Sequence, residues 1–180
     1  MRLVILDRDG VINYDSDAYI KSPQEWLPIP GSLEAIARLY QAGFMLVVAT
    51  NQSGVARGLF DLATLEAIHA KMTAAIEAAG GKLAGIFFCP HKPEDHCDCR
   101  KPKTGMLRQI ERRFDTSLNQ VPAVGDSWRD LQAAMSVAAR AILVRTGKGE
   151  ETIRQHSQAG LEIYADLAAV ADQLIKELPA

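Results

Sequence analysis

Uninterrupted apolar runs alternate with segments of helical periodicity along this chain of 180 residues. The runs LVIL at 3–6 and FMLVVAT at 44–50 are apolar almost throughout, which is typical of strands buried on both faces of a parallel sheet. Between them, residues 32–41 repeat apolar side chains at helical spacing, with Ser32 as a candidate N-cap and Gly43 as a C-terminal stop. A strand, a helix and a second strand in this order predict the crossover unit of a parallel sheet.

The alternation continues and predicts a single α/β domain over residues 1–180, built on a doubly wound, Rossmann-like parallel sheet. Residues 14–30 contain three prolines and three aromatic residues without periodicity. We therefore expect an irregular loop over the site there, too short for a large cap domain. His69 falls within a helical pattern and is expected at the core edge or surface. Further helices are expected at 61–79, 104–114, 127–139 and 166–178, and further strands at 84–88, 122–126 and 141–145.

Composition and charge argue against several classes of protein. The net charge of −2 gives no broad basic field for nucleic acid or anionic lipid. No apolar run approaches the length of a membrane span, and the first strand begins too close to the N-terminus for a signal peptide. The three cysteines cluster within residues 89–99, which is not a disulfide framework. We therefore expect a monomeric protein of the reducing cytoplasm, with no membrane or nucleic-acid partner.

Two carboxylates follow the first apolar run, in the segment DRDGVIN. Residues two apart in a strand project to the same side, so Asp7 and Asp9 are expected to share one side while Arg8 points away. Open α/β sheets bind ligands beyond the carboxyl ends of their strands. Aspartate and glycine are also ordinary turn formers, which is the alternative interpretation of an isolated D-x-D-G. The later strand ends decide between the two.

Acids, hydroxyls and cations also follow the later strands, and the set suits the transfer of a phosphoryl group to water. Asp7 would attack phosphorus and form an aspartyl-phosphate, while Asp9 would protonate the leaving alcohol and later deprotonate water. Mg²⁺ favours carboxylate and carbonyl oxygens, so Asp7, Asp126 and the backbone carbonyl of Asp9 are its candidate ligands. Lys101 would neutralise the phosphate, and Thr50 would donate a hydrogen bond to it.

A second candidate metal site follows the third apolar run. Cysteine and histidine occur there as two closely spaced pairs, Cys89 with His91 and Cys97 with Cys99. Three thiolates and one imidazole form a closed tetrahedral zinc shell of the structural type, without a position for a catalytic water. His96 is the alternative to His91 as the fourth ligand. We expect a loop stapled by Zn²⁺ that leads directly into Arg100 and Lys101.

Four segments resemble the four motifs of the haloacid dehalogenase superfamily of phosphatases: DRDGVIN, TNQSG, CRKPKTGM and VGDSWRD. TNQSGVARG, the cysteine and histidine pairs and RKPKTGM are similar, more narrowly, to its family of heptose-bisphosphate and histidinol-phosphate phosphatases. The resemblance runs from residue 3 to about residue 149. It implies Asp7 as the nucleophile and Asp9 as the acid and base. It also implies Thr50 and Lys101 as phosphate ligands and Asp126 as a ligand of Mg²⁺.

The resemblance further implies a substrate, a phosphorylated sugar. The expected reaction removes the 7-phosphate of D-glycero-D-manno-heptose 1,7-bisphosphate, on the route to ADP-heptose for lipopolysaccharide core. The alternatives are a histidinol-phosphate phosphatase, a polynucleotide 3′-phosphatase, which shares a TNQ-like segment, and a non-catalytic module that holds a partner through its zinc loop. The intact acids and Lys101 argue against the non-catalytic module, and the lack of basic patches and of a kinase half argues against the polynucleotide enzyme.

Candidate substrate ligands follow the second strand and the zinc loop: Asn51, Gln52, Ser53, Arg57 and Arg100. Arg57 is flanked by small residues, as expected of a cation that reaches into an open site, although a surface arginine is the alternative. Some relatives have a lysine where this chain has Ser127. Arg129 and Lys103 are candidates to supply the missing cation.

Overall fold

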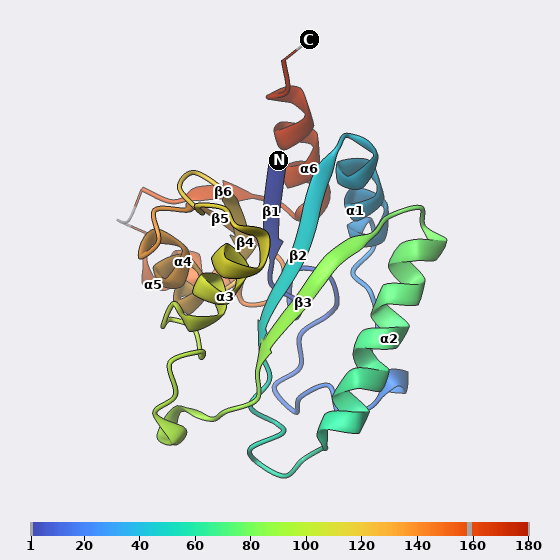
Figure 1. Ribbon diagram of the computed structural model, residues 1–180, viewed down its shortest axis with the longest axis vertical. Coiled ribbons are helices and arrows are strands. Elements are labelled where there is room, and N and C mark those ends of the chain that lie inside the picture. The colour runs from blue at the N-terminus through green and yellow to red at the C-terminus, as the bar shows by residue number, and fades with distance from the viewer. Residues whose placement is uncertain (1, 158–159, 180) are drawn as a thin grey trace.

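The computed structural model describes residues 2–157 and 160–179, and within them six parallel strands form one sheet (Figure 1). The strand order is β3-β2-β1-β4-β5-β6, so the direction of winding reverses between β1 and β4. This confirms the doubly wound sheet and places a topological switch point, the usual ligand site of such sheets, beside β1. The strands are β1 (Arg2–Leu6), β2 (Phe44–Asn51), β3 (Leu83–Cys89), β4 (Pro122–Gly125), β5 (Arg140–Val144) and β6 (Glu162–Tyr164).

Helices cover both faces of the sheet. One layer contains α1, α2 and α6, and the other contains α3 and α4 (Figure 1). Successive residues of β1 pack into opposite layers, Val4 with the first and Ile5 with the second, which is why this strand is apolar throughout. The helices are α1 (Ser32–Gln41), α2 (Leu62–Ala78), α3 (Gly105–Phe114), α4 (Trp128–Met135), α5 (Gly149–Gln155) and α6 (Leu167–Lys176), with short 3₁₀ turns at Pro23–Glu25 and Pro93–Asp95.

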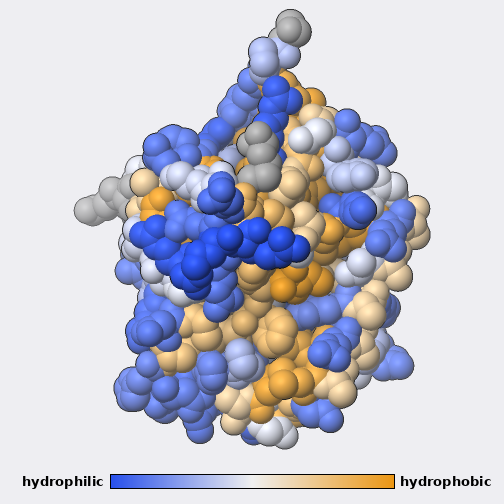
Figure 2. All heavy atoms as spheres, in the orientation of Figure 1, coloured by the Kyte–Doolittle hydropathy of each residue, from blue (hydrophilic) through white to orange (hydrophobic). Residues whose placement is uncertain are grey.

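The edges of the sheet are less buried than its centre. The residues of β3 before Cys89 are half-buried or exposed. Figure 2 shows apolar side chains on the surface over β2 and β3, with hydrophilic side chains over much of the face beside them. Within the described residues, no helix is long and apolar enough to cross a membrane.

The predicted elements agree with the structure except for the length of one helix, two missed elements near the C-terminus and the cap of α1. The prediction of a helix over 127–139 is too long, because α4 ends at Met135 and Ala138 adopts a left-handed conformation with φ of 57°. Both α5 and β6 were missed, since β6 is a three-residue edge strand, too short for a periodic signal. Ser32 is the first residue of α1 rather than its N-cap, and its hydroxyl donates to the carbonyl of Val11.

The loop over residues 14–30 is fastened to α2. The Nζ atom of Lys71 donates to the carbonyl oxygens of Pro23 at 2.6 Å and Trp26 at 2.9 Å. The indole of Trp26 is buried in the core against this helix layer. The loop is therefore fixed at its C-terminal half, while its first residues reach the carboxyl edge of the sheet.

Candidate active site

The carboxyl ends of β1, β2 and β4 and the loops that follow them enclose a cavity of about 170 Å³. The loop after β3 adds the cations at 100–101, and the first part of the 14–30 loop closes one side. Each catalytic, substrate-binding and magnesium-binding candidate of the sequence lines this cavity, namely Asp7, Asp9, Thr50, Asn51, Gln52, Ser53, Arg57, Arg100, Lys101 and Asp126. The convergence of strand ends thus gathers the candidates in one place.

Asp7 is the first residue beyond β1. Its backbone N–H donates to the carbonyl of Val124 at 2.9 Å, which ties it to β4, and its Oδ1 atom accepts the backbone N–H of Arg8 at 2.8 Å. Burial raises the pKa of Asp7 to about 6, although Lys101 opposes the shift. Its carboxylate therefore depends on nearby positive charge to stay ionised.

Lys101 supplies that positive charge. Its Nζ atom lies 3.1 Å from Oδ1 of Asp7 and 2.8 Å from Oδ1 of Asp130, and it donates to the carbonyl of Ala49 at 2.7 Å. Burial alone would lower the pKa of Lys101, but Asp130 and Asp7 together raise it above its ordinary value. The buried ammonium group is therefore charged.

Asn51 fixes the backbone on which Lys101 stands. Its Oδ1 atom accepts the N–H of Lys101 at 3.0 Å, and its Nδ2 atom donates to the carbonyl of the same residue at 3.0 Å. This pair of hydrogen bonds joins the end of β2 to the loop after the cysteines. Both polar atoms of the Asn51 side chain are thus engaged within the protein, and its contact with substrate stays a prediction.

Asp130 is a site residue that the sequence analysis missed. It is buried on the first turn of α4, where its Oδ2 atom accepts the hydroxyl of Ser127 at 2.6 Å and the backbone N–H of Ser127 at 3.1 Å. Burial raises its pKa, but Lys101 and these hydrogen bonds outweigh burial and hold the pKa below its ordinary value. Its position in the sequence GDSWRD was the available signal. Asp130 lies four residues after Asp126, on the first turn of the helix that follows the strand.

Ser127 therefore caps α4 rather than facing a substrate. Of the two cations considered in place of the relatives' lysine, Arg129 lines the cavity. Lys103 instead directs its Nζ atom to the carbonyl of Cys97 at 2.7 Å.

Four hydrogen-bond donors hold the carboxylate of Asp9. Arg8 approaches its Oδ1 atom through Nε at 3.1 Å and through Nη2 at 2.9 Å, and Asn13 donates to the same oxygen at 2.9 Å. Gln52 donates to Oδ2 at 2.8 Å. Burial raises the pKa of Asp9, but Arg8 and these hydrogen bonds more than compensate, so the pKa lies below its ordinary value.

The prediction that Arg8 points away from both carboxylates is wrong. It assumed that strand alternation continues past residue 6, but β1 ends at Leu6 and the chain turns, with the N–H of Ile12 donating to the carbonyl of Arg8 at 2.9 Å. This turn brings the fully buried guanidinium group beside the carboxylate of Asp9.

The carboxylates fit a divalent cation. Asp7, Asp126 and Asp130 can each place one oxygen within 4.8 Å of the others. Because Asp130 is taken up by Lys101 and Ser127, the first two are the available ligands. Burial and then the neighbouring acids raise the pKa of Asp126 to about 8. Such crowding of acids around a single lysine leaves excess negative charge that Mg²⁺ would balance.

Two glycines make room for the carboxylate of Asp126. A Cβ atom at Gly10 would lie 2.0 Å from its Oδ2 atom, and one at Gly147 would lie 2.1 Å from the same oxygen. Gly10 also has a φ of 81°, which other residues rarely adopt. The backbone therefore packs closely around a carboxylate whose position the fold has fixed.

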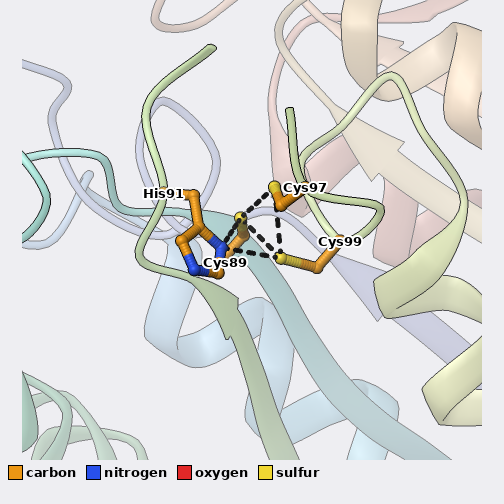
Figure 3. Close-up of side chains that lie close together, drawn as sticks. All are labelled: Cys89, His91, Cys97 and Cys99. Atoms are coloured by element: carbon orange, nitrogen blue, oxygen red, sulfur yellow. Dashed lines mark hydrogen bonds between the residues drawn. The ribbon is translucent and has the colours of Figure 1, made fainter. Parts of the chain in front are cut away.

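The cysteine loop brings its four predicted zinc ligands together (Figure 3). The Sγ atom of Cys89 lies 2.8 Å from Sγ of Cys99 and 3.6 Å from Sγ of Cys97, and Nδ1 of His91 lies 3.3 Å from Sγ of Cys99. The thiols are free. Sulfur ligands about 2.3 Å from a central ion in a tetrahedron would lie about 3.8 Å apart, so the separation of Cys89 from Cys97 fits structural Zn²⁺, and that of Cys89 from Cys99 would widen around the ion. His96 is not a member of the cluster and ends the 3₁₀ turn Pro93–Asp95 instead.

Arginines supply positive charge at the outer part of the cavity. Arg57, Arg100 and Arg129 all line it. Burial lowers the pKa of Arg100, and Arg129 and then Arg57 lower it further, so the three guanidinium groups act on one another. The Nη1 atom of Arg100 also donates to the carbonyl of His91 at 3.2 Å, which connects this cation to the zinc loop. Together they form a region suited to a second anionic group of a ligand.

The remaining wall of the cavity joins two distant loops. The Nζ atom of Lys148 lies 3.5 Å from Oδ2 of Asp15 and 3.4 Å from Oδ1 of Asp17. Its backbone N–H donates to Oδ2 of Asp126 at 2.8 Å. Lys148 was missed from the sequence, since it follows a strand without any other candidate residue in its loop.

Two family models match this chain. The model described as HAD-hydrolase-like matches residues 98–173, and the model described as Polynucleotide kinase 3 phosphatase matches residues 3–134. With the doubly wound sheet and the strand-end acids, these matches define a phosphatase of the haloacid dehalogenase class.

Relatives with assigned activities narrow the class. The D-glycero-β-D-manno-heptose-1,7-bisphosphate 7-phosphatase of Bordetella bronchiseptica is 58% identical, over 98% of this chain and 99% of the relative. The Pseudomonas putida enzyme of the same name is 56% identical, over 97% of this chain and 100% of the relative. The chain belongs to the family of D-glycero-β-D-manno-heptose-1,7-bisphosphate 7-phosphatases.

Solved structures of relatives have the same fold. The D,D-heptose 1,7-bisphosphate phosphatase of B. bronchiseptica, complexed with magnesium and phosphate, matches with a TM-score of 0.96 at 58% identity, covering 99% of this chain and 100% of that one. The corresponding phosphatase of Burkholderia thailandensis matches with a TM-score of 0.77 at 45% identity, covering 98% of this chain and 100% of that one.

Proposed function

We propose that this protein is a magnesium-dependent phosphatase that removes the 7-phosphate of D-glycero-β-D-manno-heptose 1,7-bisphosphate. The observation that carries the proposal is the position of Asp7, which faces Lys101 and lies beside Asp126 at the switch point of the sheet. Relatives named for this activity share more than half of their sequence with this chain. By the same argument, the product serves ADP-heptose synthesis for the lipopolysaccharide core.

The reaction proceeds in two steps. An oxygen of Asp7 attacks phosphorus, the bond from phosphorus to the C7 oxygen breaks, and Asp9 in its protonated form, a minor form in the free enzyme because its pKa is lowered, gives its proton to that oxygen. Water then attacks the phosphorus of the aspartyl-phosphate, Asp9 takes a proton from the water, and inorganic phosphate leaves while Asp7 is regenerated. Lys101 balances negative charge on the phosphoryl oxygens, and Thr50 donates a hydrogen bond to one of them.

Two metal ions support this chemistry. Asp7, Asp126 and the backbone carbonyl of Asp9 would hold Mg²⁺, which would supply further positive charge to the phosphoryl group. Cys89, His91, Cys97 and Cys99 would hold Zn²⁺, which would fix the loop that carries Arg100 and Lys101.

Substrate selection belongs to the outer part of the cavity. Arg57 and Arg100, with Arg129 beside them, provide positive charge for the second phosphate of the sugar. Gln52 and Ser53 are buried on the segment after β2 and line the same cavity, and we assign them contacts with the sugar. Asn51 acts mainly by holding Lys101.

The function is tested by phosphate release from four substrates, with and without Mg²⁺: both heptose bisphosphate anomers, histidinol phosphate and a 3′-phosphorylated oligonucleotide. We expect the highest kcat/KM for the β-anomer and no turnover without Mg²⁺. The oligonucleotide is included because one matching family model is named for polynucleotide phosphatases. A preference for histidinol phosphate or for the oligonucleotide would contradict the assignment of substrate while leaving the mechanism intact.

We also infer a single-domain monomer that works in the cytoplasm. One continuous sheet through the described residues supports a single domain, and free thiols arranged for zinc support a reducing compartment. Light scattering after size-exclusion chromatography and cell fractionation test the monomer and the location. A dimer at micromolar concentration would contradict the first, and recovery in the periplasm would contradict the second.

A further inference from the structure

Arg8 and His69 form a buried polar pair that the mechanism above does not use. Arg8 is fully buried, and each of its side-chain nitrogens lies against an acceptor. Its Nε and Nη2 atoms donate to Asp9, and Nη2 also lies 3.1 Å from Oε1 of Gln52. The remaining nitrogen, Nη1, lies 3.3 Å from Nε2 of His69. A guanidinium group with this many partners is fixed in one orientation.

The contact between Arg8 and His69 defines the state of the imidazole. An arginine side chain can only donate hydrogen bonds, so Nε2 of His69 must accept and its proton must reside on Nδ1. His69 is buried on α2, and its ring lies against that of Phe88, with centroids 5.8 Å apart. Because α2 is a helix of 17 residues that packs in the core, this neutral histidine ties Arg8 to a rigid element.

The guanidinium group of Arg8 also orients the carboxylate of Asp9. Arg8 contacts both of its carboxylate oxygens, at 2.9 Å for Oδ1 and 3.0 Å for Oδ2. Asn13 and Gln52 donate to one oxygen each. A general acid contributes to catalysis only when its proton lies close to the leaving oxygen, and a small rotation of the carboxyl group removes that contribution.

We propose that Arg8 and His69 are positioning residues for the general acid, with His69 holding Arg8 and Arg8 holding Asp9. The proposal rests on the phosphatase function above and adds a link from α2 to the proton that reaches the leaving oxygen. The alternative is that Arg8 only balances the buried charge of Asp9 in the folded protein. These two interpretations predict different effects of substitutions on different substrates.

The dependence on the leaving group separates these possibilities. The C7 oxygen of the heptose leaves as an alcohol and needs a proton when the bond to phosphorus breaks. The phenolate of 4-nitrophenyl phosphate is stable and leaves without one. Formation of the aspartyl-phosphate sets kcat/KM, so loss of the orientation of Asp9 lowers kcat/KM for the first substrate and spares it for the second. The later hydrolysis step, in which Asp9 acts as a base, is the same for both substrates and affects kcat instead. General damage to the protein lowers kcat/KM for both.

The experiment compares His69→Leu, which removes the acceptor, with His69→Gln, whose side-chain oxygen can accept from Arg8. We expect His69→Leu to lower kcat/KM for heptose bisphosphate about tenfold, because a misplacement of about 1 Å can cost about 100-fold and the displacement here is smaller. Its kcat/KM for 4-nitrophenyl phosphate stays near the wild-type value. His69→Gln restores most of the lost rate. An equal loss on both substrates, no loss on either, or no rescue by glutamine would overturn the proposal.

Arg8→Lys provides a second, independent variant. Lysine keeps the charge but cannot reach both oxygens of Asp9, so the same selective loss on heptose bisphosphate is expected. If Arg8 only balances charge, Arg8→Lys retains the wild-type ratio of the two rates. Should wild-type enzyme prefer histidinol phosphate, the proposed substrate fails, but the same comparison holds with that alkyl phosphate in place of the heptose.

Discussion

The ammonium group of Lys101 lies 2.8 Å from Oδ1 of Asp130, and both side chains are buried. This ion pair connects the loop after the zinc cluster to the first turn of α4. It also fixes the distance of Lys101 from Asp7, which is 3.1 Å on the other side of the same nitrogen. The position of the cation thus depends on a residue that does not follow a strand directly.

Asp130→Asn therefore lowers both activity and stability. Removal of one partner from a buried ion pair leaves the other charge poorly compensated, so we expect the free energy of unfolding to fall by about 3 kcal/mol. Urea denaturation measures this change. The control is Asp172→Asn, which breaks the exposed pair with Arg38 and should change stability by less than about 1 kcal/mol. Equal effects of the two substitutions would contradict the importance of the buried pair.

Gly10→Ala should weaken Mg²⁺ binding. The added Cβ atom would meet Oδ2 of Asp126 at 2.0 Å, so the carboxylate must move. The matched control is Gly43→Ala, which has the same positive φ but no atom within 4 Å of the added carbon. Both variants lose about 1–3 kcal/mol from backbone strain. Only Gly10→Ala should also raise the Mg²⁺ concentration needed for half-maximal activity, and a similar increase in Gly43→Ala would contradict this explanation.

Cys99→Ala should release zinc and slow the enzyme. Loss of one thiolate opens the cluster, and the loop no longer holds Arg100 and Lys101 in place. We expect kcat/KM for heptose bisphosphate to fall about tenfold, the usual order for loss of outer support at a site. Zinc content by elemental analysis accompanies the kinetics. His96→Ala, next to the cluster, keeps one zinc ion per chain, and a Cys99→Ala protein that is folded, zinc-free and fully active would refute the role of the loop.

The contribution of His69 to stability should fall below neutral pH. Burial and then Arg8 lower the pKa of His69 to about 4 in the folded protein, below the value of 6.5 for a free imidazole. The unfolded chain therefore binds more protons between these two values, so the contribution of His69 to stability decreases as the pH falls from 6.5 to 4. The slope is at most about 1.4 kcal/mol for each pH unit. The free energy of unfolding of the wild type relative to His69→Gln should therefore decrease as the pH falls through this range in urea denaturation, and a difference that does not change with pH would contradict the assignment.

The positions of Asp7, Thr50 and Lys101 were predictable because strand ends of a parallel sheet meet at one edge. The clustering of Cys89, His91, Cys97 and Cys99 was predictable because these residues are close in the sequence. The role of Asp130 was not predictable, because carboxylates are common on the first turn of a helix. Its pairing with Lys101 also depends on how two loops meet in space. The direction of the Arg8 side chain was predicted wrongly for a similar reason. The strand β1 ends at Leu6, where the chain turns, and the alternation of side chains along a strand does not reveal where the strand ends.

The rate of Asp7→Asn on heptose bisphosphate with Mg²⁺ tests the central claim most directly. Asparagine keeps the shape of the side chain but has no carboxylate to accept the phosphoryl group, so we predict that kcat falls by about 10³-fold or more. The variant should keep its zinc and its cooperative unfolding. Turnover at the wild-type rate by such a folded protein would contradict the assignment of Asp7 as the nucleophile.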